Sequence, residues 1–372
     1  MKEIELKLQG KIKRLTNKTF KFDKRVGEGW FSAVYFLKTR EIAKRFKPNA
    51  IVTMQFFQKS AEEAVLCGTD EAIALVHTFA ENPEELEIKS LKDGDKITAY
   101  EPVLTITGPY QNFGFLEGLI DGILARRTSV ATNVYNVVKA ASYSGKQKPI
   151  IFMGDRDDHF SQQAGDGYAA YIGGSTAQAT HAMNEWWGKE GMGTMPHALL
   201  QLFEGDVVAA TKAYHETFPN DELMALVDYN NDVITDSLRV AREFKDKLAA
   251  VRLDTSRTLV DKYFCRNQEI LGDFDPRGVN PQLIFALREA LDKEGFQHVK
   301  IVVSGGFTEE RILEFEKNHV PVDMYGVGSS LLKIHNGFTG DNVLLNGKPE
   351  AKAGRRFRPN PRLETVEYIK EE

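Results

Sequence analysis

Val302-Val303-Ser304-Gly305-Gly306 and Met324-Tyr325-Gly326-Val327-Gly328-Ser329 are two short apolar runs, and each ends in a glycine turn. Between them, Thr308 can cap a helix whose first turn carries Glu309 and Glu310. The order is therefore strand, turn, helix, strand, turn. Glycine lets a backbone approach a ligand closely, and a helix start attracts an anion. The pair can be two ordinary barrel turns or a phosphate site, which barrel enzymes commonly place in their last two strand-to-helix loops.

Apolar runs of strand length, including the two of this pair, alternate with helical patterns from residue 149 onward. The runs are 149–153, 223–227, 248–253, 299–303 and 322–325, and a strand near Met192 brings the number to about six. This alternation predicts parallel β/α units. We expect a TIM-like α/β barrel, complete or short of eight strands. A doubly wound sheet is disfavoured because no Gly-x-Gly-x-x-Gly follows an apolar run.

The helical patterns and the change of texture near residue 113 suggest two domains. Residues 113–141 read as a helix pair that joins the domains, with a break near Thr128. Two later helices are expected at 233–248, with Asp232 as N-cap, and at 281–293, with Asn280 as N-cap. We predict a smaller N-terminal α+β domain at 1–112, joined by the C-terminal segment 336–372, and an α/β-barrel domain at 113–335.

Composition describes an ordinary globular protein. The chain has 372 residues, is 42% hydrophobic and 27% charged, and carries a net charge of −5. We expect no export signal and no membrane span, since there is neither an apolar signal core nor a run of about 18 apolar residues. Two cysteines suit a reducing cytoplasm, and mild acidity argues against a nucleic-acid partner. The basic stretch 348–362 reads as a solvated tail.

Charged side chains gather where the predicted strands end. They are Arg156, His197, Asp228, Arg252 and Asp254. Singly each has a structural explanation, because an Arg and an Asp two residues apart on a strand can pair, and a lone His is usually a core residue. Together at one barrel mouth they would be costly unless a ligand bound there.

Four motifs, taken in order, resemble the nicotinate phosphoribosyltransferases, which are type II phosphoribosyltransferases. They are Gly193-Thr194-Met195-Pro196-His197-Ala198-Leu199, Val251-Arg252-Leu253-Asp254-Thr255, Val303-Ser304-Gly305-Gly306 and Gly326-Val327-Gly328-Ser329. The resemblance runs from about residue 30 to residue 350. It implies that nicotinate displaces pyrophosphate from phosphoribosyl pyrophosphate and forms nicotinate mononucleotide, a step in the biosynthesis and salvage of NAD.

The resemblance also implies roles for particular residues. The catalytic group is His197, Asp228, Arg252 and Asp254, with Asp228 and Asp254 near ribose or Mg²⁺. The substrate-binding group is Tyr35, Arg156, His159, Thr194, Ser304, Gly305, Gly306, Gly326, Gly328 and Ser329, of which the glycine turns would hold the ribose 5′-phosphate. Members of the family phosphorylate the residue that matches His197 with ATP as co-substrate. Tyr35 would reach across a homodimer, or a higher oligomer, to stack on the partner's pyridine ring.

The chain departs from the family's pattern at positions that bear on the base. Ala33 replaces an Asp, Met153 an aromatic residue, Asp157 an Arg, Thr176 an Asp, and Asn133 a basic residue. Losing a charge-assisted contact costs about 1.5–3 kcal/mol, so several such changes can alter substrate choice. The phosphate and ribose motifs are retained.

These departures keep other functions open. The nearest alternative is transfer to nicotinamide, quinolinate or another nitrogen heterocycle. A protein that binds phosphoribosyl pyrophosphate or a nucleotide without catalysis is an alternative of another class. A sugar-phosphate isomerase or aldolase is a third, although no Schiff-base lysine stands out at a strand end.

Overall fold

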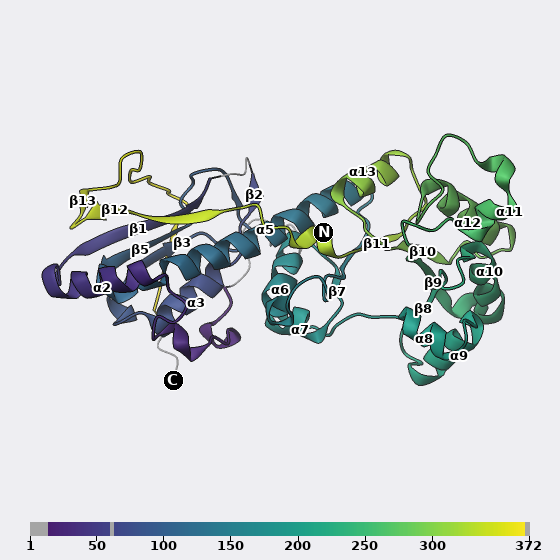
Figure 1. Ribbon diagram of the computed structural model, residues 1–372, viewed down its shortest axis with the longest axis horizontal. Coiled ribbons are helices and arrows are strands. Elements are labelled where there is room, and N and C mark those ends of the chain that lie inside the picture. Colours follow the sequence, from purple (N-terminus) through teal and green to yellow (C-terminus); the bar gives the residue numbers. More distant parts are fainter. Residues whose placement is uncertain (1–13, 60–62, 369–372) are drawn as a thin grey trace.

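The computed structural model describes residues 14–59 and 63–368. Two parts lie side by side in Figure 1, one built on an antiparallel sheet and the other on a parallel sheet. The long helix α5 (Glu117–Ala141) runs between them. Mixed α/β architecture of this kind is what the sequence predicts.

The antiparallel sheet has the strand order β13-β12-β1-β5-β3-β14. Its strands are β1 (Ile51–Gln58), β3 (Glu87–Ser90), β5 (Leu104–Pro109), β12 (Phe338–Leu345), β13 (Lys348–Pro349) and β14 (Glu364–Val366). β2 (Ala64–Val65) and β4 (Lys96–Ile97) form a separate pair. The helices of this part are α2 (Val34–Phe46), α3 (Thr69–Phe79) and α4 (Tyr110–Phe113). Three of its strands therefore come from the C-terminal segment.

The basic C-terminal stretch 348–362 bonds to residues in and beside this sheet. The prediction that it is a solvated tail was therefore wrong. Gln55 on β1 donates to the Arg358 carbonyl and accepts from the Arg358 amide. Arg362 forms an ion pair with Glu101 at 2.7 Å. Carboxylates and carbonyls distant in sequence supply these partners, which composition alone does not reveal.

The parallel sheet has the order β7-β6-β11-β10-β9-β8. Its strands are β6 (Ile150–Phe152), β7 (Ala177–Gln178), β8 (Leu223–Leu226), β9 (Leu248–Leu253), β10 (Lys300–Val303) and β11 (Met324–Val327). Among the described residues β7 and β8 do not pair with each other, so the sheet is an open half-barrel. The expected strand near Met192 was wrong. β7 takes its place, and Met192 only donates its amide to the Gln178 carbonyl at 2.8 Å.

Helices follow the strands around this half-barrel. They are α6 (Gln163–Gly173), α7 (His181–Asn184), α8 (His197–Leu202), α9 (Val207–Thr217), α10 (Val233–Phe244), α11 (Lys262–Arg266), α12 (Pro281–Lys293) and α13 (Glu309–Lys317). The N-caps predicted at Asn280 and Thr308 are confirmed, because each side chain accepts an amide of its helix. Asp232 is the N-cap residue of α10 as predicted, but its side chain accepts no amide of the helix. Its carboxylate pairs with Arg266, and Asp261 accepts the Val233 amide instead.

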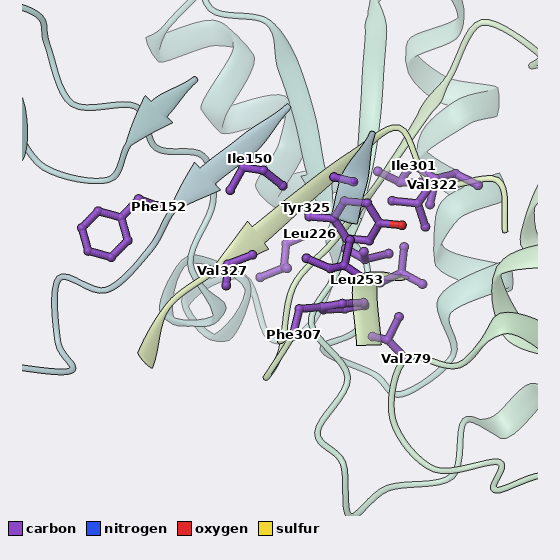
Figure 2. Packing of buried hydrophobic residues seen from close by; sticks show 14 of the residues in the cluster. Ile150, Phe152, Leu226, Leu253, Val279, Ile301, Phe307, Val322, Tyr325 and Val327 are labelled. Atoms are coloured by element: carbon purple, nitrogen blue, oxygen red, sulfur yellow. The ribbon is translucent and has the colours of Figure 1, made fainter. Parts of the chain in front are cut away.

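Alternation along the parallel strands separates two faces of the sheet. Val251 and Leu253 on β9, and Tyr325 and Val327 on β11, belong to the large core beneath the helices. Figure 2 shows such residues from neighbouring strands packing together, with Phe307 close to Tyr325. The alternate residues point to the opposite, concave face.

α5 is one continuous helix, so the expected break near Thr128 was wrong. The Thr128 hydroxyl is buried and bonds both the amide and the carbonyl of Cys67, which removes the cost of a polar side chain inside the helix. Ile120 and Leu124 of this helix join the core of the antiparallel part, and Val134 joins the core of the half-barrel. One helix thereby packs in both cores.

A buried ion cluster lies where α5 meets both parts. Arg127 donates to Glu71 on α3 at 2.8 Å and to Asp166 on α6 at 2.8 Å. Asp166 also accepts from Arg126. Gly165 leaves room for this cluster, because a Cβ there would lie 1.9 Å from the Arg127 guanidinium carbon.

No helix among the described residues is long and apolar enough to cross a bilayer.

We expect Arg127→Met to destabilise the protein strongly, because Glu71 and Asp166 would then be buried carboxylates without their main cation. Breaking a buried pair costs about 3–5 kcal/mol. Thermal unfolding followed by circular dichroism measures the effect. Arg242→Met removes an exposed pair with Glu294 and serves as the control. Equal melting temperatures for the two variants would contradict a structural role for this cluster.

Candidate functional site

A cavity of about 510 Å³ opens at the carboxyl ends of the parallel strands. In part it is lined by predicted site residues, namely Arg156, Thr194, His197, Arg252, Asp254, Ser304, Gly305, Gly306, Gly326, Gly328 and Ser329. These residues come from loops that lie up to 173 positions apart in the chain, from 156 to 329. Parallel pairing brings them together, because all carboxyl ends of a parallel sheet share one edge.

The cavity occupies the concave face of the sheet. Met224 on β8, Arg252 on β9 and Gly326 on β11 line it. Each alternates with residues that pack under the helices, such as Val251 and Val327. Strand alternation therefore places core and cavity residues on opposite faces of the same strands.

The two glycine turns need glycine for different reasons. Gly305 and Gly306 have φ of 92° and 69°, a left-handed region that other residues rarely adopt. At Gly326 the limit is space, since a Cβ would lie 2.7 Å from the Met153 sulfur. At Gly328 a Cβ would lie 2.8 Å from an Asp157 carboxylate oxygen. Both turns thus present bare backbone to the cavity.

Arg252 points across the cavity with spare hydrogen-bonding capacity. It donates to the Thr194 hydroxyl at 3.4 Å and lies 3.8 Å from the Asp254 carboxylate. Its Nε is buried and has no partner among the described residues. Ser304 donates to Asp254 at 2.8 Å and so orients that carboxylate. A guanidinium this loosely paired is free to bind an anionic ligand.

His197 begins α8, and its Nε2 lies 2.9 Å from an Asp228 carboxylate oxygen. The other Asp228 oxygen is buried without a partner among the described residues. Burial raises the pKa of Asp228, and the hydrogen bond with His197 opposes that shift. An ionised Asp228 keeps the imidazole proton on Nε2 and leaves Nδ1 as a free base.

Carboxylates of the site suit a hard divalent cation. Asp155, Asp157 and Asp254 line the cavity, and Asp228 has an unpartnered oxygen. The described residues contain no group of three or more side chains arranged to hold a metal by themselves. That donor set fits Mg²⁺ bound by one or two carboxylates together with substrate phosphates.

Three predicted site residues lie outside the cavity lining: Asp228, which bonds the lining residue His197, and also Tyr35 and His159. Tyr35 is on α2 in the antiparallel part and is 65% exposed. His159 follows the strand β6 but packs against Phe160 and bonds the Ser161 hydroxyl. Neither Tyr35 nor His159 contacts the cavity of its own chain.

Of the residues that depart from the family pattern, some line the cavity and others lie outside it. Met153 and Asp157 line the cavity. Asn133 instead donates to the carbonyls of Leu331 and Lys333, and Thr176 donates to the Ile150 carbonyl. Ala33 stands at the N-cap of α2. Of these five residues, Met153 and Asp157 are the ones placed to affect a bound base.

Sequence reasoning missed several apolar lining residues. Ile151, Met192 and Met224 line the cavity although they read as strand core. Ile151 is two residues before Met153, and Met224 lies on the concave face with Ala250 and Val302. Counting alternation back from Met153 would have indicated Ile151, whereas Met192 and Met224 are brought to the cavity by the fold.

The chain is similar in sequence and in fold to several known proteins. Residues 33–128 match the family described as "Quinolinate phosphoribosyl transferase, N-terminal domain". A crystal structure of nicotinate-nucleotide pyrophosphorylase from Pyrococcus furiosus is similar with a TM-score of 0.76 and 29% identity, covering 95% of this chain and 86% of that one. A human nicotinic acid phosphoribosyltransferase shares the fold, with a TM-score of 0.66 and 17% identity over 86% of this chain and 75% of that one.

A nicotinate phosphoribosyltransferase of Mycobacterium tuberculosis is 28% identical over 253 residues, which is 66% of this chain and 50% of that protein. One of Bacillus subtilis is 26% identical over 255 residues, or 66% of this chain and 46% of that protein. The chain spans about half the length of the curated relatives it matches. By its half-barrel fold, its matched N-terminal domain and these relatives, the chain is similar to the type II phosphoribosyltransferases.

Proposed function

We propose that the protein is a nicotinate phosphoribosyltransferase that works in NAD biosynthesis. One observation carries the proposal. Arg252, Asp254 and both glycine turns line a single cavity at the carboxyl ends of the parallel strands. A site with bare amides at one end and charged side chains beside them suits a ribose that carries a phosphate and a pyrophosphate.

The proposed reaction needs little covalent chemistry from the protein. The ring nitrogen of nicotinate donates its lone pair to the anomeric carbon, and the bond from that carbon to pyrophosphate breaks. The bonding electrons leave with pyrophosphate, and the ring nitrogen becomes cationic. No proton moves, so catalysis consists of positioning and of stabilising charge.

Each part of the cavity has a place in this reaction. The turns at Gly305–Gly306 and Gly328–Ser329 hold the 5′-phosphate, while Arg252 faces the pyrophosphate. Asp254, oriented by Ser304, lies on the ribose side. Arg156 meets the carboxylate of the base or a phosphate, where its planar fork suits paired oxygens.

We include Mg²⁺ as the cofactor. Asp254, which lines the cavity, and Asp228, which bonds the lining residue His197, would hold it together with substrate phosphates. When bound, Mg²⁺ would neutralise charge on pyrophosphate. The residues themselves orient the ribose and the leaving group.

His197 couples the reaction to ATP in this proposal. With its proton held on Nε2 by Asp228, its Nδ1 lone pair attacks the γ-phosphorus of ATP and ADP leaves, which gives a phosphohistidine. Hydrolysis of that phosphoryl group then drives nucleotide synthesis. His197 is half-exposed, so a nucleotide in the cavity can reach it.

We further propose a homodimer in which Tyr35 completes the partner's site. The segment before α2 and the helix itself expose Trp30, Phe31, Val34, Tyr35, Ile42 and Phe46. None of the residues of α2 is buried in the chain. A cluster of large apolar side chains on one helix marks an interaction surface.

We place the enzyme in the reducing cytoplasm, in keeping with its two free cysteines.

A second candidate keeps the transfer but changes the base. Asp157 places a carboxylate beside Gly328 in the cavity, which repels an anionic base and favours a neutral one such as nicotinamide. Quinolinate, with two carboxylates, fits these charges least well.

A panel of bases tests the function directly. Purified protein with phosphoribosyl pyrophosphate and Mg²⁺ is incubated with nicotinate, nicotinamide or quinolinate, with and without ATP. We expect pyrophosphate release and nicotinate mononucleotide, measured by chromatography, and more product with ATP. Product from nicotinamide alone would replace the first candidate by the second. Binding of phosphoribosyl pyrophosphate without product from any base would indicate a non-catalytic binding protein.

Arg252→Gln is the matched variant for this panel. Because a charge-assisted contact to pyrophosphate would be lost, we expect the KM for phosphoribosyl pyrophosphate to rise about tenfold or more. Arg242→Gln, on the exposed face of α10, is the control. An unchanged KM in Arg252→Gln would exclude the placement of pyrophosphate.

Labelling with γ-phosphate of ATP tests the coupling. We expect a base-stable, acid-labile phosphoprotein that is absent in His197→Ala and present in His298→Ala. Asp228→Asn should label about tenfold less, since the imidazole loses the carboxylate that holds its proton. Burial raises the pKa of Asp228, so protonation on acidification should reduce labelling at a higher pH than for an ordinary carboxyl. Undiminished label in His197→Ala would refute the assignment.

Mixing two impaired variants, assayed at phosphoribosyl pyrophosphate well below its KM, tests the dimer. Tyr35→Ala keeps an intact cavity, and Arg252→Gln keeps an intact Tyr35. If Tyr35 acts on the partner's site, one site of each mixed dimer is complete, and random exchange restores about a quarter of the activity. No recovery after exchange, with mixed dimers shown by native mass spectrometry, would exclude action across an interface.

A further inference from the structure

Both carbonyls of the first glycine turn are bound from behind by arginines. Arg311 donates Nη1 to the Gly305 carbonyl at 3.2 Å, and Arg257 donates Nη2 to the Gly306 carbonyl. A second nitrogen of Arg311 donates to the Val279 carbonyl. The two guanidiniums line an outer cavity of about 810 Å³ and not the site cavity. They therefore hold the turn from the side opposite the proposed ligand.

Neither arginine forms an ion pair with a carboxylate of the described residues. Arg311, in the first turn of α13, lies over the Phe307 ring at 4.4 Å and near the Phe315 ring at 5.7 Å. Burial and the nearby Arg257 charge lower the pKa of Arg311 to about 10, while Glu314 opposes the shift. It remains protonated at neutral pH. Two cations thus lie behind the turn without a direct ion pair, although Glu314 is close enough to act on Arg311.

Binding of the carbonyls determines what the turn offers to the cavity. With the Gly305 and Gly306 carbonyls held outward, their peptide groups are fixed. The amides of Gly305, Gly306 and Phe307 have no acceptor among the described residues. Successive free amides in a turn form a concave site for an anion.

The charges of the cavity lining give positive potential behind the turn a role in binding an anion. Asp155, Asp157 and Asp254 face it, against the two guanidiniums of Arg156 and Arg252. The lining is therefore net negative, whereas a phosphorylated ribose is itself an anion. Positive charge close behind the turn reduces this repulsion without occupying the cavity.

We propose that Arg257 and Arg311 are positioning residues for a phosphomonoester, the 5′-phosphate of the sugar substrate. They hold the Gly305–Gly306 carbonyls away from the cavity and supply positive potential behind the turn. This inference rests on the proposed function, because it deepens the role of the same turn. It adds two residues that do not line the site cavity.

Ribose 5-phosphate is the probe, and calorimetry measures its dissociation constant in the full chain. We expect Arg311→Gln and Arg257→Gln each to weaken its binding about fivefold to tenfold, as for the loss of a charge-assisted contact. Arg311→Lys keeps the charge and should lose less than Arg311→Gln. Arg277→Gln is the matched control, since Arg277 lines the same outer cavity but pairs with Asp275.

Three readouts separate this role from a merely structural one. The KM for phosphoribosyl pyrophosphate should rise in the glutamine variants while the KM for the base stays unchanged, and the salt dependence of ribose 5-phosphate binding should become weaker. Unchanged binding in both glutamine variants, or an equal loss for the base, would overturn the inference. Arg257 is exposed, so its variant keeps the test valid if Arg311→Gln fails to fold.

The result is distinguishable from failure of the proposed function. If the unmutated protein binds ribose 5-phosphate but transfers no base, the proposed function fails and the variants still decide the inference. If it does not bind ribose 5-phosphate, the phosphate assignment of the turn fails and the inference falls with it.

Discussion

Parallel pairing of the half-barrel strands is the constraint on which the rest of the structure depends. Because β9, β10 and β11 run in one direction, Arg252 pairs in register with Val302, and Val302 with Met324. The residues that follow these strands must then meet at one edge. Ser304 and Asp254 are 50 positions apart and yet hydrogen-bonded at 2.8 Å. No local feature of the chain accounts for that contact.

A second constraint comes from burying charge between the two parts. Arg127 stabilises the junction only while Glu71 and Asp166 accept from it, so three elements must keep their positions together. Arg126 extends the cluster to Asp158, in the loop that carries Arg156 to the cavity. The packing of α5 and the geometry of the site are linked through these neighbouring arginines.

The cavity combines requirements that conflict electrostatically. A phosphorylated sugar needs positive charge, but the carboxylates that orient ribose and suit Mg²⁺ add negative charge. The chain meets both needs by using backbone amides for the phosphate and by placing Arg257 and Arg311 behind the turn. Glycine suits this turn because Gly306 has a φ of 69°, in the left-handed region that other residues rarely adopt.

Local signals in the sequence by themselves determined the long apolar strands, the caps at Asn280 and Thr308 and the two glycine turns, since each depends on neighbours within a few residues. Tertiary structure alone decided where longer-range partners act. The Asp232 side chain pairs with Arg266, 34 residues later, instead of accepting an amide of its helix. β7 has only two residues, which are too few to form a recognisable sequence pattern. α5 continues through Thr128 because the Thr128 hydroxyl donates a hydrogen bond to the Cys67 carbonyl. Tyr35 lies on α2 in the antiparallel part, outside the cavity lining of its own chain, and only the fold shows that separation.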